Sequence, residues 1–361
     1  MSSLQFTLSR EPPSSDERAA LDDHLRDMGA DEAVWDVFGC FLATRSATTR
    51  PLALRASRDG RLAGIAFMVE CTAYGRSLFD GPWLAWALDH SGIPALTWLR
   101  SGLCAETFAN PGFVANGFDR GATIAAMISW LRRHRPVLFV NDSTANRPLH
   151  ARAREFPYVR DGAVDIAGMS SVSDYIAQHN NIRRKIKGFA NKGGTIDLIE
   201  GPLGDGDMAG VAHCVASTVD NSIIASPFQD LFPEMVAATC AHPSPRFVHL
   251  VAHLDGQMLG YHSFVRTGRG LRMLHGAFDR TLKSTLHAYE NLIIRAVAHG
   301  IERRLDRVHF GPILNETKRR MMNATEPAAL FFSSNNPLLG TAIPAFFPLT
   351  KMQSRELLAF R

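Results

Sequence analysis

Apolar residues alternate with polar ones on both sides of two Asp-Gly pairs, one in each half of the chain. Residues 52–69 (LALRASRDGRLAGIAFMV) align with residues 248–265 (VHLVAHLDGQMLGYHSFV), so that Asp59-Gly60 corresponds to Asp255-Gly256. An Asp-Gly pair between alternating apolar runs is typical of a two-residue hairpin turn, because a type I′ turn needs positive φ at both positions. Each half is therefore predicted to contain a β-hairpin.

The similarity between the halves continues after each hairpin. An F-D-R tripeptide, at 118–120 and again at 278–280, is followed by a helical pattern and then by an apolar run, at 136–140 and 307–310. We interpret the shared order of hairpin, strand, helix and strand as an internal duplication, and the alternative is a coincidence of common α/β elements. The predicted domains are residues 1–165 and 166–361, and the second is expected to carry the active cleft.

Between the halves, apolar residues recur every three or four positions from Tyr175 to Phe189. This spacing predicts an amphipathic helix that begins at a capping box, Ser171 and Asp174, and ends near Lys187. Its outer face is the densest basic patch of the chain, with no acidic residue between 174 and 197, and carries Arg183, Arg184, Lys185 and Lys187, with Lys192 just beyond. Such a patch either binds a phosphate-bearing substrate or is an ordinary solvated helix face.

A second long helix is predicted from Ser284 or Thr285 to about residue 304, followed by a strand at 307–311 and a short basic helix at 315–320. On the long helix Tyr289 belongs to the apolar stripe and is expected in the core. Its neighbours Glu290 and Asn291 are expected to face solvent. The apolar, Pro-rich segment 328–350 is expected to supply a closing strand.

Composition narrows the possible functions. Of 361 residues, 39 are Lys or Arg and 35 are Asp or Glu, which gives a net charge of +4. This charge is too small to indicate a protein that binds nucleic acid over its whole surface, so any basic site must be local. The chain has neither an apolar run of about 18 residues nor the apolar core of a signal peptide, so we expect a soluble, cytoplasmic protein without a transmembrane segment. Its five cysteines include no C-x-x-C pair, so we expect buried thiols and no metal site.

Taken in order, these features resemble the GNAT superfamily, specifically the tandem-GNAT group that includes FemABX-like aminoacyltransferases and CelD/BcsL-type acetyltransferases. The resemblance covers residues from about 50 to 325. It rests on S-x-x-x-Y-I-A-Q-H-N-N-I-R-R-K-I-K at 171–187, on the second Asp-Gly hairpin and on G-A-F-D-R at 276–280. It implies an α/β (α+β) fold of two GNAT-like units. Each would be a mixed, mostly antiparallel sheet flanked by helices and splayed between its fourth and fifth strands.

The resemblance implies an acyltransferase that uses acyl-CoA, such as acetyl-CoA, as co-substrate and transfers the acyl group to an amine by direct attack. The family's phosphate loop, Q/R-x-x-G-x-G/A, is degenerate here, and its glycine positions hold Lys283 and Thr285. Glycines there let the backbone approach a phosphate closely. Two alternatives therefore stay open: a FemABX-like transferase that draws on aminoacyl-tRNA, and a non-catalytic binding protein of the same fold. The expected donor-binding residues are Arg280, Lys283, Ser284 and Thr285.

Three residues are the candidates for catalysis. His275 is expected to accept the proton of the attacking amine, and Asp279, four positions along the same strand, to orient the amine. Lys318 follows the last strand, where the family often carries a lysine, and is expected to stabilise the oxyanion. The alternative for each is a structural role, as a packed histidine, a strand-end cap or a surface lysine.

The remaining candidates are expected to hold the acceptor. The acceptor is expected to be an amine on a small molecule or on a cell-envelope sugar, and aminoacyl-tRNA stays open as a partner. The predicted substrate-binding residues are Arg183, Arg184, Lys187, Tyr261, Asn315 and Glu316.

Overall fold

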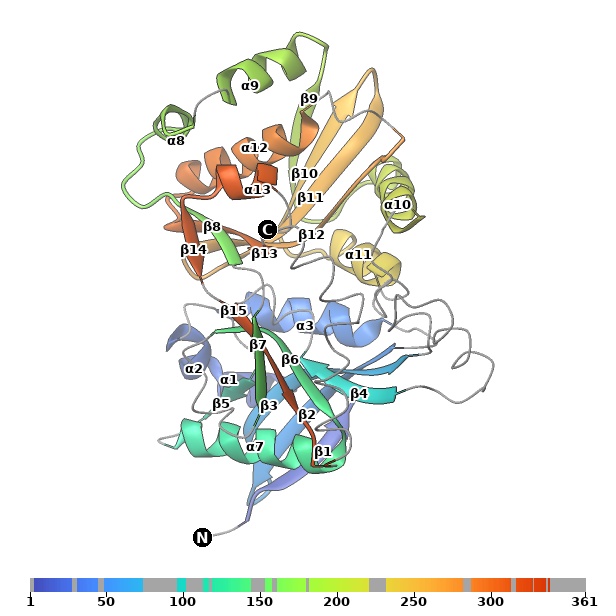
Figure 1. The fold of residues 1–361 in the computed structure, drawn as a ribbon, viewed down its shortest axis with the longest axis vertical. Helices are drawn as coiled ribbons and strands as arrows, with labels where there is room; N and C mark the ends of the chain where they lie inside the picture. The colour runs from blue at the N-terminus through green and yellow to red at the C-terminus, as the bar shows by residue number, and fades with distance from the viewer. Residues whose placement is uncertain are drawn as a thin grey trace.

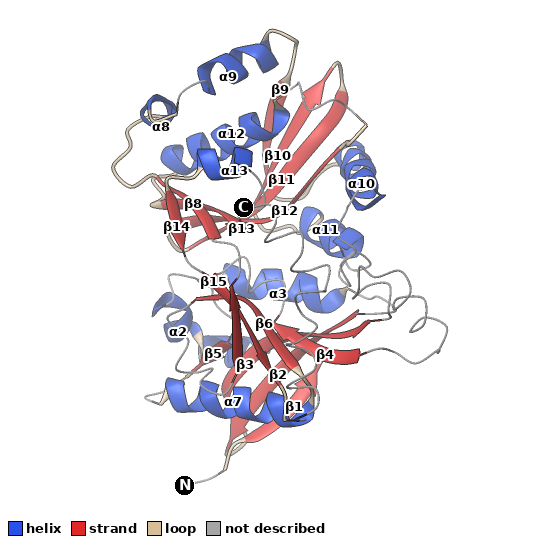
Figure 2. Cartoon of the chain, viewed as in Figure 1, coloured by secondary structure: helices blue, strands red, loops and turns tan. Residues whose placement is uncertain are grey.

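Two mixed β-sheets, each flanked by helices, make up the chain in a computed structural model (Figures 1 and 2). The predicted fold class is confirmed. The structure describes residues 3–27, 31–44, 49–73, 96–101, 113–116, 119–143, 153–157, 161–179, 182–220, 232–281, 287–312, 316–326, 328–335 and 337.

The first sheet contains eight strands, of which β4 and β6 form its parallel pair. Helix α7 precedes β6 in the chain, and helices α1, α2 and α3 precede β2. The strand order is β1 (Gln5–Ser9), β2 (Thr49–Arg58), β3 (Arg61–Ala73), β4 (Leu96–Ser101), β6 (Val137–Ser143), β15 (Ala328–Ser333) and β7 (Arg154–Pro157), with β5 (Phe113–Ala115) on β3. The helices are α1 (Ser15–Ala19), α2 (Asp22–Asp27), α3 (Ala33–Ala43) and α7 (Arg120–His134).

The second sheet has seven strands and repeats this order, with the single strand β12 in the place of β4 and β5, and its parallel pair is β12 and β13. The order is β9 (Thr195–Glu200), β10 (Phe247–Leu254), β11 (Gln257–Thr267), β12 (Gly270–Phe278), β13 (Arg307–Pro312), β8 (Asp161–Asp165) and β14 (Ala324–Glu326). Its helices are α8 (Val172–Ala177), α9 (Ile182–Ala190), α10 (Asp205–Asp220), α11 (Phe232–Cys240), α12 (Ala288–Glu302) and α13 (Glu316–Met321). Helices α10 and α11 cover one face of this sheet, and α8, α9, α12 and α13 lie on the other.

Both predicted hairpins are present. Asp59 and Gly60 have φ of 53° and 74°, and Asp255 and Gly256 have φ of 50° and 78°, as a type I′ turn requires. Each hairpin also carries a β-bulge at the same distance from its turn, next to Gly64 in the first sheet and Gly260 in the second. The repeat predicted from the sequence thus extends to the irregularities of the strands.

The two F-D-R tripeptides, however, are not equivalent. Gly64 pairs with Ala115, whereas its counterpart Gly260 pairs with Phe278. Ala115 is therefore the structural counterpart of Phe278, and our alignment of the tripeptides is wrong by three residues. The repeat rests on strand order and register rather than on this motif.

One strand of each sheet comes from the other half of the chain. Strand β15, near the end of the chain, lies between β6 and β7 of the first sheet, and β8 lies between β13 and β14 of the second. The strands of each sheet therefore do not all come from one side of the boundary at residues 165 and 166. The division of the chain into two domains at this boundary stays a prediction. Because each sheet is completed by an exchanged strand, separating the two sheets would break backbone pairing in both.

The predicted single helix over 171–187 is wrong, because the segment forms two helices, α8 and α9. The capping interaction at its start is present, since Asp174 Oδ2 accepts a hydrogen bond from Ser171 N at 2.9 Å. Both helices pack on α12, and α8 is also attached through Tyr175, whose hydroxyl donates to the Met321 carbonyl at 2.8 Å.

Helix α3 lies between the two sheets (Figure 1). Eight of its 11 residues are buried, so the helix is enclosed on nearly all sides rather than along one stripe. Its side chains share one core cluster with Phe247 and Val265 of the second sheet. The ring of Phe38 stacks on Phe67 of β3 with centroids 3.3 Å apart. The junction between the sheets is thus a continuous apolar core.

We predict that Phe38→Ala lowers the free energy of unfolding by about 3–5 kcal/mol, because it leaves a cavity in this shared core. Urea unfolding followed by tryptophan fluorescence measures the change. Phe6→Ala, a half-buried ring on the outer face of the first sheet, is the matched control and should cost less. A loss below about 1 kcal/mol for Phe38→Ala would contradict the packing described for α3.

Four buried histidines make the stability of the second sheet dependent on pH. Burial lowers the pKa of His249 to about 4, and of His262 and His275 to about 3. Burial, together with the charges of Arg272 and Arg307, lowers the pKa of His309 to about 2. These rings stay neutral in the folded protein but take up protons in the unfolded chain below a pH of about 6.5.

The contribution of these histidines to the free energy of unfolding is therefore complete above pH 6.5, and the free energy of unfolding is expected to fall as the pH drops toward 4. Each histidine that gains a proton on unfolding contributes a slope of about 1.4 kcal/mol per pH unit. Urea titrations between pH 7.5 and pH 5 measure that slope, and His262→Leu, which removes a ring without hydrogen bonds, should reduce it by about one proton. An unchanged slope in this variant would refute the assignment.

Candidate functional site

Strands β12 and β13 part from each other within the second sheet. Their backbone pairing extends only from Gly270–Arg272 to Arg307–His309, although β12 continues to Phe278. A bulge at Leu274 changes the direction of β12 at this point. The splay between the fourth and fifth strands, which the resemblance implied, is confirmed in the second sheet. The parted segment of β12 offers backbone groups that a ligand can pair with.

Asp279 follows directly on the parted segment and is tightly held. Its side chain is 1% exposed. Its Oδ1 accepts hydrogen bonds from Thr281 N at 2.9 Å and from Thr281 Oγ1 at 2.6 Å. The Thr281 hydroxyl is the main cause that lowers the pKa of Asp279 to about 2, with His213 contributing against the effect of burial. Asp279 is therefore an anion at neutral pH.

The partner of this anion is His213 of α10, a residue that the sequence analysis missed. His213 Nε2 lies 3.0 Å from Asp279 Oδ2, and its side chain is 58% exposed. The signal in the sequence was slight, since His213 and Ser217 are four residues apart on one face of a predicted helix, and both contact Asp279. Nothing in the sequence indicates that this face meets a residue 66 positions away.

His275 and Tyr261 are part of the core rather than of an open site. His275 is buried, its Nε2 lies 2.6 Å from Thr239 Oγ1, and its Nδ1 lies 3.2 Å from the Tyr261 hydroxyl. With both nitrogens engaged and the ring enclosed beneath α11, His275 is not placed to accept a proton from a substrate. Tyr261 is fully buried, so it does not contact a substrate either. Both expectations are corrected.

Lys318 is also buried, contrary to the expectation of an open cation. Its ammonium group donates a hydrogen bond to the Phe310 carbonyl on β13. Its charge also helps burial to lower the pKa of His262, so the two side chains lie near each other on the α12 face of the sheet. The described contacts indicate that Lys318 ties α13 to β13.

We therefore predict that Lys318→Ala lowers the free energy of unfolding by about 1–3 kcal/mol, because it leaves a buried carbonyl without this donor. Thermal and urea unfolding measure the loss. Arg320→Ala on the same helix, whose side chain is 76% exposed, is the control and should change stability by less than about 0.5 kcal/mol. Equal stability of Lys318→Ala and the wild type would contradict the buried, hydrogen-bonded position described for Lys318.

The predicted donor-binding residues fall only partly within the described chain. Arg280 is exposed directly after Asp279, and its backbone N–H donates to Ser217 Oγ at 2.8 Å. Helix α12 begins at Ala288, later than expected, and Glu290 and Asn291 in its first turn are buried rather than solvated. Lys283, Ser284 and Thr285 lie outside the described residues, as does Asn315.

The predicted acceptor-binding residues do not gather in one place. Arg183, Arg184 and Lys187 are exposed on α9, whereas Lys185 turns inward to Glu290 Oε1 at 2.5 Å. Glu316 lies on the surface of α13 and pairs with Arg319 at 2.7 Å and with Arg320 at 2.8 Å. The basic face of α9, formed by Arg183, Arg184, Lys187 and the nearby Lys192, thus stays a separate surface feature.

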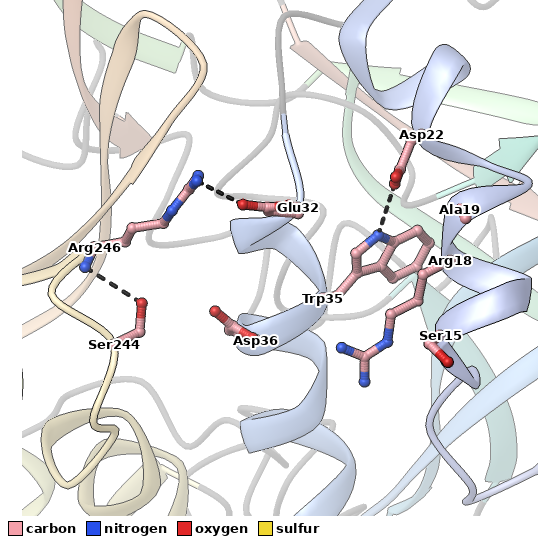
Figure 3. A pocket seen from close by; sticks show the side chains of 9 residues that line it. All are labelled: Ser15, Arg18, Ala19, Asp22, Glu32, Trp35, Asp36, Ser244 and Arg246. Atoms are coloured by element: carbon pink, nitrogen blue, oxygen red, sulfur yellow. Dashed lines mark hydrogen bonds and ion pairs between the residues drawn. The ribbon is translucent and has the colours of Figure 1, made fainter.

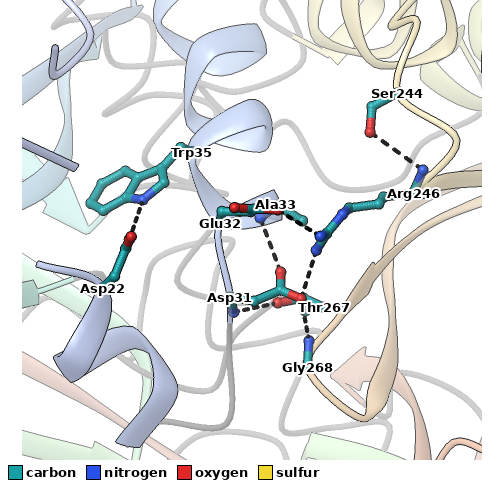
Figure 4. Close-up of polar contacts among 9 residues, drawn as sticks. All are labelled: Asp22, Asp31, Glu32, Ala33, Trp35, Ser244, Arg246, Thr267 and Gly268. Atoms are coloured by element: carbon teal, nitrogen blue, oxygen red, sulfur yellow. Dashed lines mark hydrogen bonds and ion pairs between the residues drawn. The ribbon is translucent and has the colours of Figure 1, made fainter. Parts of the chain in front are cut away.

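A cavity of about 390 Å³ lies at the junction of the two sheets, away from the parted strands (Figure 3). It is lined by Ser15, Arg18, Ala19, Asp22, Glu32, Trp35, Asp36, Ser244 and Arg246. At one wall Arg246 bridges to Asp31 at 2.6 Å and to Glu32 at 2.7 Å (Figure 4).

The carboxylate of Asp31 connects the start of α3 to the second sheet. It accepts hydrogen bonds from Gly268 N at 2.9 Å and from Ala33 N at 3.0 Å. Burial acts to raise the pKa of Asp31, but these hydrogen bonds and Arg246 outweigh it, and the net pKa is lowered. This cluster is a structural clamp between the sheets, and the cavity beside it includes none of the predicted site residues.

No group of three or more His, Cys, Asp or Glu among the described residues is arranged to hold a metal ion. No described helix combines the length and apolar character needed to cross a membrane. Cys40, Cys214 and Cys240 are buried free thiols, as expected.

The comparisons with known proteins agree with this geometry. Residues 177–319, which include β12, Asp279 and β13, match the acetyltransferase (GNAT) domain family. L-PGS from Bacillus licheniformis shares the fold at 11% identity over 97% of this chain and 98% of its own, with a TM-score of 0.56. No curated protein matches the sequence significantly.

Two further solved structures share the fold over nearly the whole chain. The C-terminal domain of a putative lysylphosphatidylglycerol synthetase from Agrobacterium fabrum is 12% identical over 95% of this chain and 98% of its own, with a TM-score of 0.54. FemX is 10% identical over 93% of this chain and 98% of its own, with a TM-score of 0.52. At these identities the likeness is one of fold, and it extends to both sheets.

Proposed function

We propose that this chain is a GNAT-type acyltransferase of the tandem-GNAT group, and that it transfers an acyl group from acyl-CoA to an amine by direct attack. The acceptor is an amine on a small molecule or on a cell-envelope sugar, and the reaction takes place in the cytoplasm. We also infer that the two sheets arose by duplication, since they share strand order and bulge position.

The observation that carries this proposal is the early end of pairing between β12 and β13. An acyl carbonyl placed beside the parted segment meets a stretch of β12 that is not paired with β13, whose backbone N–H groups can stabilise the tetrahedral oxyanion. A neutral amine can then attack that carbonyl without a covalent enzyme intermediate. This use of the splay needs no nucleophilic side chain, and none is described at this point of the sheet.

Charge near the end of β12 supports a donor that carries phosphates. Arg280 is exposed beside the parted strand, and α12, which follows it in the chain, turns its N-terminal end toward the same region. A helix N-terminus and an arginine both favour anions. In this proposal Arg280 binds a phosphate of acyl-CoA.

Aminoacyl-tRNA is the second candidate donor. The exposed basic face of α9 favours it, because three cations on one helix face suit a nucleic-acid backbone. The name of one fold neighbour, the putative lysylphosphatidylglycerol synthetase from Agrobacterium fabrum, also refers to an aminoacylated product. We rank this donor second because these cations lie on the surface of α9, whereas Arg280 directly follows the parted segment of β12.

The proposal predicts release of free CoA when the protein is incubated with acetyl-CoA and a primary amine. Glucosamine, spermidine and lysine serve as probes, a thiol reagent measures CoA, and mass spectrometry measures the acetylated amine. Arg280→Ala should raise the KM for acetyl-CoA about tenfold with little change in kcat, because a charge-assisted contact to phosphate is lost.

Arg135→Ala, an exposed arginine of the first half, is the control and should leave KM unchanged. A parallel incubation with lysyl-tRNA and the same amines tests the second donor. Turnover with lysyl-tRNA and none with acetyl-CoA would replace the first proposal by the second. Failure to bind or use either donor would leave the non-catalytic alternative.

A further inference from the structure

We propose that His213 is the general base of the transfer, and that Asp279 is the positioning residue that orients it. This inference rests on the proposed acyl transfer to an amine. His213 takes the role that the sequence analysis gave to His275. His275 lies on β12 and is enclosed in the core, whereas His213 lies on α10 and is exposed.

The first support is the orientation of the imidazole ring. Asp279 is an acceptor only, because it is ionised, so the ring nitrogen 3.0 Å from its Oδ2, Nε2, is the one that carries the proton. The neutral ring then has its lone pair on Nδ1. The side chain is 58% exposed, and in this proposal the lone pair on Nδ1 faces the incoming amine.

The second support is the rigidity of the carboxylate. Asp279 is held through Oδ1 by the backbone and hydroxyl of Thr281, which leaves Oδ2 directed at His213. Ser217 Oγ lies a further 3.5 Å from Oδ1. A carboxylate fixed on one oxygen and presented on the other sets both the tautomer and the direction of the imidazole, as in hydrolytic triads.

The third support is the place of the pair in the sheet. Helix α10 is bound to the end of β12 by Thr218 Oγ1, which accepts from Phe278 N at 3.0 Å and donates to the Phe278 carbonyl at 3.1 Å. Ser217 holds the next amide, that of Arg280. His213 is thus carried by the helix segment that is bound to β12 where the strand has separated from β13.

These features define a balanced step. The amine nitrogen bonds to the thioester carbonyl carbon, and the proton that it loses passes to His213 Nδ1. The carbon–sulfur bond then breaks, and its electron pair leaves with sulfur as the CoA thiolate. The products are the amide, the thiolate and an imidazolium that Asp279 stabilises until its proton passes to solvent.

Three variants test the role of each group. His213→Gln and His213→Ala should each lower kcat with acetyl-CoA and the best amine probe by about 100-fold or more, with the KM for acetyl-CoA changed less than about twofold. Asp279→Asn keeps an oxygen for Thr281 but presents an amide donor to Nε2. It should lower kcat by about 100-fold or more, because the ring then carries its proton on Nδ1.

Chemical rescue distinguishes a base from a structural residue. Imidazole added to His213→Ala should restore kcat by about tenfold or more, and more basic imidazoles should restore more. The matched control is His253→Gln, which removes another histidine paired with an aspartate, His253 Nδ1 to Asp197 Oδ2 at 3.1 Å, but on strands β10 and β9, which β11 separates from β12. It should retain wild-type kcat.

A second measurement does not depend on turnover. Nitrogen-15 NMR of histidine-labelled protein should show His213 with its proton on Nε2 in the wild type and on Nδ1 in Asp279→Asn. Wild-type kcat in His213→Gln, or a proton on Nδ1 in the wild type, would overturn the inference while leaving acyl transfer intact. A wild-type protein that transfers no acyl group, yet shows the Nε2 tautomer, would instead refute the proposed function.

Discussion

The separation of β12 from β13 is the constraint from which the arrangement of the site follows. Pairing stops at Arg272 and His309 because the bulge at Leu274 turns β12, and the strand then needs room on its α12 face. Gly276 provides it, since a Cβ there would lie 2.5 Å from the His262 ring. A larger residue would displace that ring, so the course of the parted strand depends on a glycine.

Two features keep the sheets together and thereby hold the parted strand in place. The exchanged strands β8 and β15 join the sheets through backbone hydrogen bonds, and α3 joins them through an apolar core. At the edge of this junction Asp31 and Arg246 add a polar clamp. Because β13 pairs with the exchanged strand β8, one side of the splay is itself part of the connection between the sheets.

Local chemistry explains what the sequence could predict. The Asp-Gly turns, the strand at 307–311 and the cap at Ser171 depend on neighbouring residues, and the structure contains all three. The destination of β15 and the break between α8 and α9 depend on partners far away in the chain. Periodicity shows that a residue is buried or exposed on its own element, but not which element covers it.

The same limit explains the errors at the candidate site. His275 was placed on the correct strand, but its enclosure by Thr239 and Tyr261 comes from packing of α11. In the sequence, Lys318 is one of several cations on a short helix. Only the structure shows that its side chain is buried and donates to the Phe310 carbonyl. Asp279 is expected at the site from its position after the strand, and this stays a prediction, whereas its contact with His213 depends on the packing of α10.

The first turn of α12 bears on the nature of the donor. A helix N-terminus ordinarily attracts a phosphate, but here Glu290 is buried in that turn and is paired with Lys185. Its negative charge compensates part of the positive charge at the N-terminus of α12. In addition, the phosphate loop has no glycine at the two expected positions, which hold Lys283 and Thr285. Backbone N–H groups therefore contribute less to phosphate binding here than in a glycine-rich loop. A phosphate-bearing donor then depends more on side-chain cations, and Arg280 is the exposed cation nearest in sequence to the parted strand.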